Sequence, residues 1–235
     1  MPILPRSADR RRRELASLLD HLQRMREAGP LSEVPKLCVE GLNRVDREFP
    51  DLRPRAYPPL LTTLAFAQWS LEEFGAASDT YARLATFGEE HGGAPEDVEF
   101  AWEGASRSAG EAEQHEAAEG YARRAIALAS EVGDAHLIAR TTVLLGETLA
   151  AQDRKAEATD TYHSALEVPL GDSDDAAFTR CQSYLGLARM ALKRGDGASA
   201  RLWSEQLKET LGHVKHPNAR FSEIVDELLE DVSRA

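Results

Sequence analysis

Histidine, cysteine and carboxylate side chains are the groups from which a metal centre or a nucleophilic active site would be built. The sequence holds seven histidines and two cysteines. Only His213 and His216 lie close together, and the proline that follows them predicts a loop there. Cys38 and Cys181 are far apart in sequence, and no CxxC or HExxH spacing occurs. We therefore expect no metal site and no bound cofactor.

A short acidic run, Gly171 to Asp175, has part of the pattern of a calcium-binding loop. It lacks the glycine at the sixth loop position and the closing glutamate that such loops use. Serine and aspartate also cap helices, because their side chains accept hydrogen bonds from the first free backbone amides. The run therefore predicts a connecting loop, in which Ser173 or Asp174 caps the next helix.

Sequence signatures of enzymes are missing as well. The chain has no glycine-rich phosphate loop, no GxSxG and no cysteine–histidine arrangement with a useful spacing. Catalysis is therefore not expected.

The composition predicts an all-α protein. The 235 residues include 36 Ala and 29 Leu, which are the best helix formers, against only 14 Val plus Ile. A net charge of −12 makes nucleic acid an unlikely partner, because phosphate contacts need a basic surface. No run approaches the roughly 18 apolar residues that a membrane span needs, so no membrane partner is expected.

The basic run Arg10 to Arg13 is the one dense positive patch in the sequence. It could touch an acidic partner or nucleic acid, but a solvated helix face is the simpler interpretation. The apolar stretch before the first arginine is only four residues long, which is too short for the core of a signal peptide. Two distant cysteines are typical of buried free thiols, so a cytoplasmic location is expected.

The sequence repeats every 40 or 41 residues. In three copies a tyrosine follows an alanine by four residues, and a fourth copy has a tryptophan beside the expected position: Ala77 and Tyr81, Ala117 and Tyr121, Ala158 and Tyr162, Ala200 with Trp203. Residues four apart share one helix face, so the alanine would let a neighbouring helix approach and the aromatic ring would fill the space beside it. Another helical stretch precedes each pair, which predicts stacked helical hairpins.

These residues resemble the tetratricopeptide repeat family. The third copy matches its order best, with Leu145-Gly146 followed by Ala158, Tyr162 and Ala165. In the fourth copy the stretch Lys193 to Asp196 is similar to the family's turn between two helices. The second copy, with Gly104-Ala105, is weaker and its register could slip by one. The period exceeds the family's usual 34 residues and is similar to the longer repeats of bacterial regulators and adaptors.

The resemblance implies a right-handed superhelical solenoid of stacked antiparallel hairpins. Three parts are expected: an N-terminal helix pair with a proline-rich connection over residues 1–57, four repeats over 58–211, and a capping helix over 212–235. The prolines between Phe49 and Pro59 predict that this connection is irregular.

The resemblance also implies a concave groove lined by the first helix of each hairpin. Aromatic residues gather toward one half of it and cations toward the other, and both types favour binding hot spots. We expect an apolar partner side chain near Trp69 and Trp102 and an acidic group near Arg189 and Lys193. The alternative is that the tryptophans are core residues and the cations are only solvated. The implied groove residues are Thr62, Phe66, Trp69, Trp102, Ser106, Arg140, Val143, Glu147, Gln182, Arg189 and Lys193.

Two functions follow from this resemblance. The first is a non-catalytic adaptor or chaperone-like binder that takes a peptide or helix of a partner protein on the groove. The second is a regulatory sensor of a peptide or small ligand, coupled to transcription or signalling. The partner is expected to be a protein or peptide, and assembly into a homo-oligomer is left open.

Overall fold

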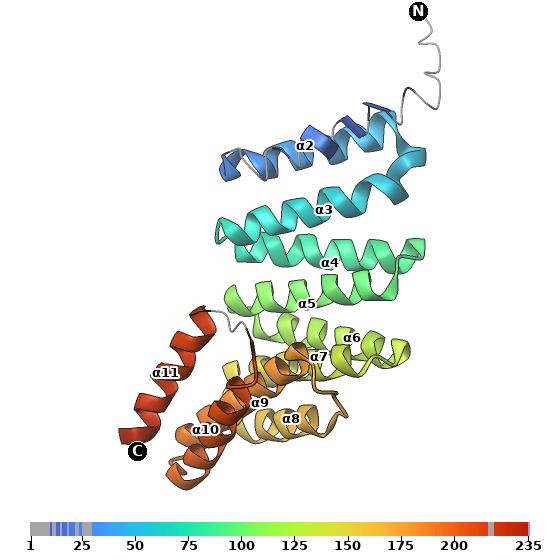
Figure 1. Cartoon of the computed structure of the whole chain (residues 1–235). Coiled ribbons are helices and arrows are strands. Elements are labelled where there is room, and N and C mark those ends of the chain that lie inside the picture. Colours follow the sequence, from blue (N-terminus) through green and yellow to red (C-terminus); the bar gives the residue numbers. More distant parts are fainter. Residues whose placement is uncertain are drawn as a thin grey trace, which may run out of the picture. The chain divides into compact units, whose positions relative to one another are not determined.

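The computed structural model is built of helices (Figure 1). It describes residues 30–215 and 219–234 together with single residues nearer the N-terminus: Arg10, Arg13, Glu14, Ala16, Ser17, Leu19, Asp20, His21 and Arg24. All regular elements in this part of the chain are α-helices or short 3-10 helices. The all-α prediction is therefore confirmed.

The chain divides into two compact units, Met1–Gln114 and His115–Ala235. In the first unit each α-helix packs against the next one along the chain, from α2 to α5. Its elements are η1 (Leu31–Glu33), α2 (Val34–Glu48), η2 (Pro50–Leu52), α3 (Arg53–Ser70), α4 (Phe74–His91) and α5 (Pro95–Glu111).

In the second unit consecutive helices also pack together, and α9 additionally contacts α7 and α11. Its elements are α6 (His115–Val132), α7 (Ala135–Ala151), α8 (Lys155–Glu167), α9 (Asp174–Lys193), α10 (Gly197–Leu211) and α11 (Ala219–Arg234). Helix α9 therefore lies at the centre of this unit's packing.

Four turns that share one left-handed residue and one capping hydrogen bond mark the repeats. One residue in each has a left-handed conformation: Glu72, Glu113, Asp153 and Gly195, with φ of 61°, 59°, 58° and 74°. The next residue donates its backbone N–H to the carbonyl five residues earlier, which caps the end of the preceding helix. These bonds join Glu73 to Gln68, Gln114 to Ala109, Arg154 to Leu149 and Asp196 to Ala191, at 2.8–3.0 Å. The turn predicted at Lys193 to Asp196 is confirmed.

Counting from this left-handed residue gives the register of each following helix. The fifth residue after it is alanine in all four copies, and each of these alanines is 0% exposed: Ala77, Ala118, Ala158 and Ala200. In the second copy the sequence pattern had favoured Ala117, but that residue is only half-buried. The register of this copy is therefore shifted by one residue.

The same shift separates the tyrosines. Tyr81 and Tyr162 are the ninth residue after their turns, and their side chains are 8% and 3% exposed. Tyr121 and Trp203 are the eighth residue after theirs, which rotates them by about 100° around the helix, and both are only half-buried. Tyr81 and Tyr162 therefore occupy equivalent positions, and the expectation that Tyr121 shares them is wrong.

The proline-rich stretch is mostly helical, contrary to the expectation of an irregular connection. Helix α3 begins at Arg53 and contains Pro58 and Pro59. These prolines remove two backbone donors near the start of the helix. The loss is offset because Leu60 and Leu61, which follow directly, are both 0% exposed. The expected boundary between residues 57 and 58 falls inside this helix.

The two ends of the chain are described only in part. Among residues 7–28, Arg10 and Arg13 are helical, whereas Arg11 and Arg12 of the basic run lie outside the described residues. His216 lies outside them too. The expected C-terminal amphipathic helix is α11, and it packs its apolar face against residues of α9 and α10. The buried residues of that face are Phe221, Val225, Leu228 and Val232.

Both cysteines are buried free thiols, as predicted. Burial raises the pKa of the Cys38 thiol to about 12 and that of Cys181 to about 11. Neither thiol is therefore ionised near neutral pH, and neither is a candidate nucleophile.

Candidate partner-binding pocket

A pocket lined by both charged and apolar side chains lies among α7, α8 and α9 in the second unit. Its volume is about 170 Å³, which is room for on the order of ten water molecules. The residues that line it are Glu147, Ala150 and Ala151 from α7, Tyr162 from α8, and Gln182, Leu185, Gly186, Arg189, Met190 and Lys193 from α9. Four of these were predicted for the groove: Glu147, Gln182, Arg189 and Lys193.

The charges of the pocket are divided between two helices. Arg189 and Lys193 are exposed on α9, one helical turn apart, and Glu147 is exposed on α7. Among the described residues, no carboxylate lies within ion-pair distance of Arg189 or Lys193. The α9 side of the pocket therefore offers two positive charges to a bound group.

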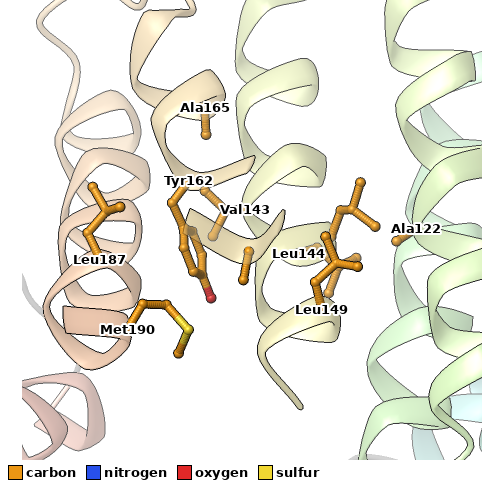
Figure 2. Packing of buried hydrophobic residues seen from close by; sticks show 10 residues of the cluster. Ala122, Val143, Leu144, Leu149, Tyr162, Ala165, Leu187 and Met190 are labelled. Atoms are coloured by element: carbon orange, nitrogen blue, oxygen red, sulfur yellow. The ribbon is translucent and has the colours of Figure 1, made fainter. Parts of the chain in front are cut away.

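Tyr162 is held in the wall of this pocket by two glycines. A Cβ atom at Gly146 of α7 would lie 2.7 Å from Cε1 of the ring, and one at Gly186 of α9 would overlap the ring outright. Figure 2 shows the ring between the helix that carries Leu187 and Met190 and the helix that carries Val143. The glycines allow both helices to close on the two faces of the tyrosine.

The pKa of the Tyr162 hydroxyl is influenced by charged side chains of the pocket. Burial raises the pKa of this phenol above its usual range, and the negative charge of Glu147 raises it further. The positive charge of Arg189 acts in the opposite direction. These effects indicate that the hydroxyl lies within electrostatic reach of both walls, and that it stays protonated at neutral pH.

Three of the predicted groove residues are buried, which corrects their assignment. Trp102 and Ser106 are 1% exposed, and Val143 is 1% exposed within the core of the second unit. The indole Nε1 of Trp102 donates a hydrogen bond of 2.8 Å to Glu89 of α4. Trp102 therefore points from α5 toward α4, and the alternative that it is a core residue is the correct one.

The other predicted residues are accessible but do not line the pocket. In the first unit, Thr62 and Trp69 are half-buried, and the Trp69 ring packs edge-on against Phe74 with 5.0 Å between centroids. Phe66 is 48% exposed. Arg140 is half-buried on α7, in the second unit.

Sequence reasoning missed Tyr162 as a lining residue of the pocket. The repeat pattern assigned it to the core, and its 3% exposure agrees with that role. The glycine at position 186, one residue before the core residue Leu187, was the available signal, because a glycine inside a helix indicates a close approach of another group.

Metal binding and membrane insertion are two further properties that the described part of the chain could have. No group of three or more histidine, cysteine, aspartate or glutamate residues there is placed to hold a metal ion. No helix formed by these residues is both long and apolar enough to cross a membrane.

Several solved structures share this fold. The TPR-like repeats of a kinesin light chain from Podosopora anserina superpose with a TM-score of 0.62 and 14% identity, covering 87% of this chain and 98% of that one. The fold is TPR-like. BtubC (BKLC) from P. vanneervenii gives a TM-score of 0.62 and 16% identity, covering 91% of this chain and 95% of its own. No protein-family model matches the sequence, and no curated protein sequence matches it either.

The TPR-like fold confirms the resemblance that the sequence carried. At 14–16% identity the likeness extends to the fold alone. The ligand of this protein therefore depends on its own side chains.

Proposed function

We propose that this protein is a non-catalytic interaction module that holds an acidic side chain of a partner protein in the α7–α8–α9 pocket. The observation that carries the proposal is the pair of cations on α9, Arg189 and Lys193, at the rim of a pocket with room for a side chain. TPR-like repeats are stacked helical hairpins, and such repeats use extended surfaces to bind peptides and helices. The protein would act in the cytoplasm.

A carboxylate fits the chemistry of this pocket better than a more highly charged group. Arg189 and Lys193 supply two positive charges, and Glu147 on the opposite wall supplies one negative charge. The three side chains together leave one net positive charge, which a single carboxylate neutralises. A phosphate dianion would leave an excess of negative charge beside Glu147.

The proposal is tested by selecting peptides from a random display library on the immobilised full-length chain. We expect the enriched peptides to carry aspartate or glutamate at one constant position. The same peptides should lose binding to the double variant Arg189→Glu, Lys193→Glu, because the reversed charges repel the acidic group.

The matched control is the double variant Arg201→Glu, Lys208→Glu. Both residues are exposed on α10, outside the pocket, and the change in net charge is the same. Peptides that bind wild type and this control, and not the pocket variant, support the proposal. Equal loss in both variants, or no enrichment of acidic peptides on wild type, contradicts it.

A further inference from the structure

Packing against Gly146 and Gly186 accounts for the ring of Tyr162 but not for its hydroxyl. Its side chain is 97% buried, since only 3% of its surface is exposed. Within residues 30–215 and 219–234, no other group forms a hydrogen bond with this hydroxyl. The hydroxyl oxygen is not among the fully buried side-chain atoms that lack a partner in the described part of the chain, so it reaches solvent, where water or a ligand can bond to it.

The place where this hydroxyl could find a partner is the pocket. Tyr162 is one of the residues that line it, together with Arg189 and Glu147, whose charges both act on the phenol. In Figure 2 the hydroxyl oxygen lies at the end of the ring near the Met190 side chain, and Met190 is also a lining residue. A group that enters the pocket can therefore reach the hydroxyl.

We propose that the Tyr162 hydroxyl donates a hydrogen bond to the carboxylate of the bound partner, and so selects an oxygen acceptor at the inner end of the pocket. This inference rests on the proposed function, because Arg189 and Lys193 must first attract the acidic group. The cations supply attraction with little directional preference, whereas the phenol supplies one donor at a fixed position. Its position is fixed because Gly146 and Gly186 enclose the ring on both faces.

The chemistry of the phenol suits this role. A tyrosine hydroxyl can donate or accept, and its raised pKa keeps the proton on the oxygen in the physiological range. Hydrogen bonds to an ionised acceptor are among the stronger ones in proteins. The same donor gives less to a neutral amide oxygen, so the site should favour glutamate over glutamine beyond what the two cations provide.

The second observation in support comes from the equivalent tyrosine of the first unit. Tyr81 is also the ninth residue after its turn and lies against Gly104, with 2.8 Å from a Cβ position there to the ring. Packing between hairpins therefore needs the aromatic ring in both units. The two tyrosines differ in their charged neighbours. Tyr162 lines a pocket that also contains charged side chains, whereas the pKa of Tyr81 is raised by burial. Tyr81 is the natural control for the hydroxyl group.

The test uses the full-length chain with ¹³C at Cζ of its tyrosines, observed by NMR. The probe is N-acetyl-glutamate N-methylamide, which carries one carboxylate and no other charge. N-acetyl-glutamine N-methylamide is its neutral isostere. We expect the glutamate probe to shift the Cζ resonance of Tyr162 and to leave that of Tyr81 unchanged. The neutral probe should bind at least tenfold more weakly.

Two conservative variants separate the hydroxyl from the ring. Tyr162→Phe should weaken binding of the glutamate probe by about tenfold, because one hydrogen bond to a charged acceptor is lost. Tyr81→Phe should leave the dissociation constant unchanged. The Cζ shift in wild type needs no variant, so the inference stays testable even if Tyr162→Phe folds poorly.

The outcomes distinguish the inference from the function on which it rests. In one outcome the glutamate probe binds wild type and fails to bind the double variant Arg189→Glu, Lys193→Glu, which supports the pocket. If Tyr162→Phe then binds the probe as tightly as wild type, and the Cζ resonance of Tyr162 does not shift, the role of the hydroxyl is refuted. If the probe does not bind wild type, or binds the double variant equally well, both proposals fail.

Discussion

A glycine inside a helix normally weakens that helix by about 1 kcal/mol relative to alanine. Gly146 and Gly186 nevertheless lie inside α7 and α9, where the ring of Tyr162 occupies the space that a methyl group would need. Ala158 is buried on the face of α8 that also carries Tyr162, and its small side chain permits close approach of the helices. Small residues and one aromatic ring together therefore set the spacing of these helices.

This packing predicts opposite effects for two identical substitutions. Gly186→Ala should lower the free energy of unfolding by roughly 1–3 kcal/mol, because the added methyl group overlaps the Tyr162 ring. Gly120→Ala, in α6, should raise it by about 0.5–1 kcal/mol, because a Cβ there meets nothing within 4 Å. Urea denaturation of both variants measures the difference. Stabilisation by Gly186→Ala would show that the helices are not in close contact at Tyr162.

The raised pKa of Tyr162 predicts how the free energy of unfolding changes at alkaline pH. Its pKa is raised in the folded protein, mainly by burial, whereas an unfolded tyrosine ionises near pH 10. Stability from this group is therefore complete below about pH 10 and is lost as pH rises toward the folded pKa, by about 1.4 kcal/mol per pH unit. The reason is that only the unfolded chain gains the charge.

The measurement is urea denaturation of wild type and Tyr162→Phe at several pH values between 8 and 11. The difference in unfolding free energy should be constant up to about pH 10 and should then shift in favour of the phenylalanine variant. Tyr81→Phe is a useful comparison, since burial raises the pKa of Tyr81 as well. A constant difference across the whole range would mean that the Tyr162 phenol is as accessible when folded as when unfolded.

At the scale of the elements, the turn between the two helices of each hairpin is the most regular feature of the chain. Left-handed backbone costs roughly 1–2 kcal/mol for residues other than glycine. Three of the four turns nevertheless use an acidic residue at this position, and only the last uses a glycine, Gly195. The capping hydrogen bonds of the turns therefore stabilise a conformation that three of the side chains disfavour.

Substitutions at this turn position should act according to backbone conformation alone. Gly195→Ala should lower the free energy of unfolding by about 1 kcal/mol, because its φ of 74° strains an alanine. Glu113→Gly should raise it by a smaller amount, because glycine relieves the strain but loses more entropy on folding. Thermal unfolding of the two variants tests this, and equal signs of the two shifts would contradict it.

The hairpins could be predicted from the sequence because each copy combines helix-forming residues with an alanine and an aromatic residue at nearly fixed spacing. The start of the first hairpin could not, because its prolines predicted an irregular connection where α3 has already begun. The register of the second copy could not. Ala117 with Tyr121 and Ala118 with Ala122 both satisfy the four-residue spacing, and the aromatic residue made the first choice look better. The structure takes the second choice, with Ala118 and Ala122 fully buried.

The candidate site was predictable only for its polar part. Glu147, Arg189 and Lys193 are long charged side chains on first helices, and burying them without partners would be costly, so their exposure follows from their chemistry. Trp102, Ser106 and Val143 have no such cost, and the rotation of each helix decides whether they face a neighbour or solvent. That rotation depends on packing between helices, which the spacing of one sequence does not specify.

At the scale of the whole molecule, charge gives no preference for one unit over the other. Residues 1–114 and 115–235 each contain 14 Lys and Arg against 20 Asp and Glu, a formal net charge of −6 apiece. An acidic partner therefore meets a negative background on either unit. Recognition must come from the local cations Arg189 and Lys193, acting within about a Debye length of roughly 8–10 Å.

Helical repeat proteins gain stability from contacts between neighbouring hairpins, so damage at one end should stay local. Leu228 of α11 is 4% exposed and packs with residues of α9 and α10, such as Cys181 and Leu207. Leu228→Ala removes this contact at a cost of about 2–5 kcal/mol. We expect amide hydrogen exchange to accelerate in α9, α10 and α11, while α3 and α4 of the first unit keep their protection.

Asp226→Ala, on the exposed face of α11, is the control and should change neither region. Equal acceleration in α3 and α9 after Leu228→Ala would instead mean that the two units unfold as one cooperative body, and that the pocket's stability depends on every hairpin in the chain.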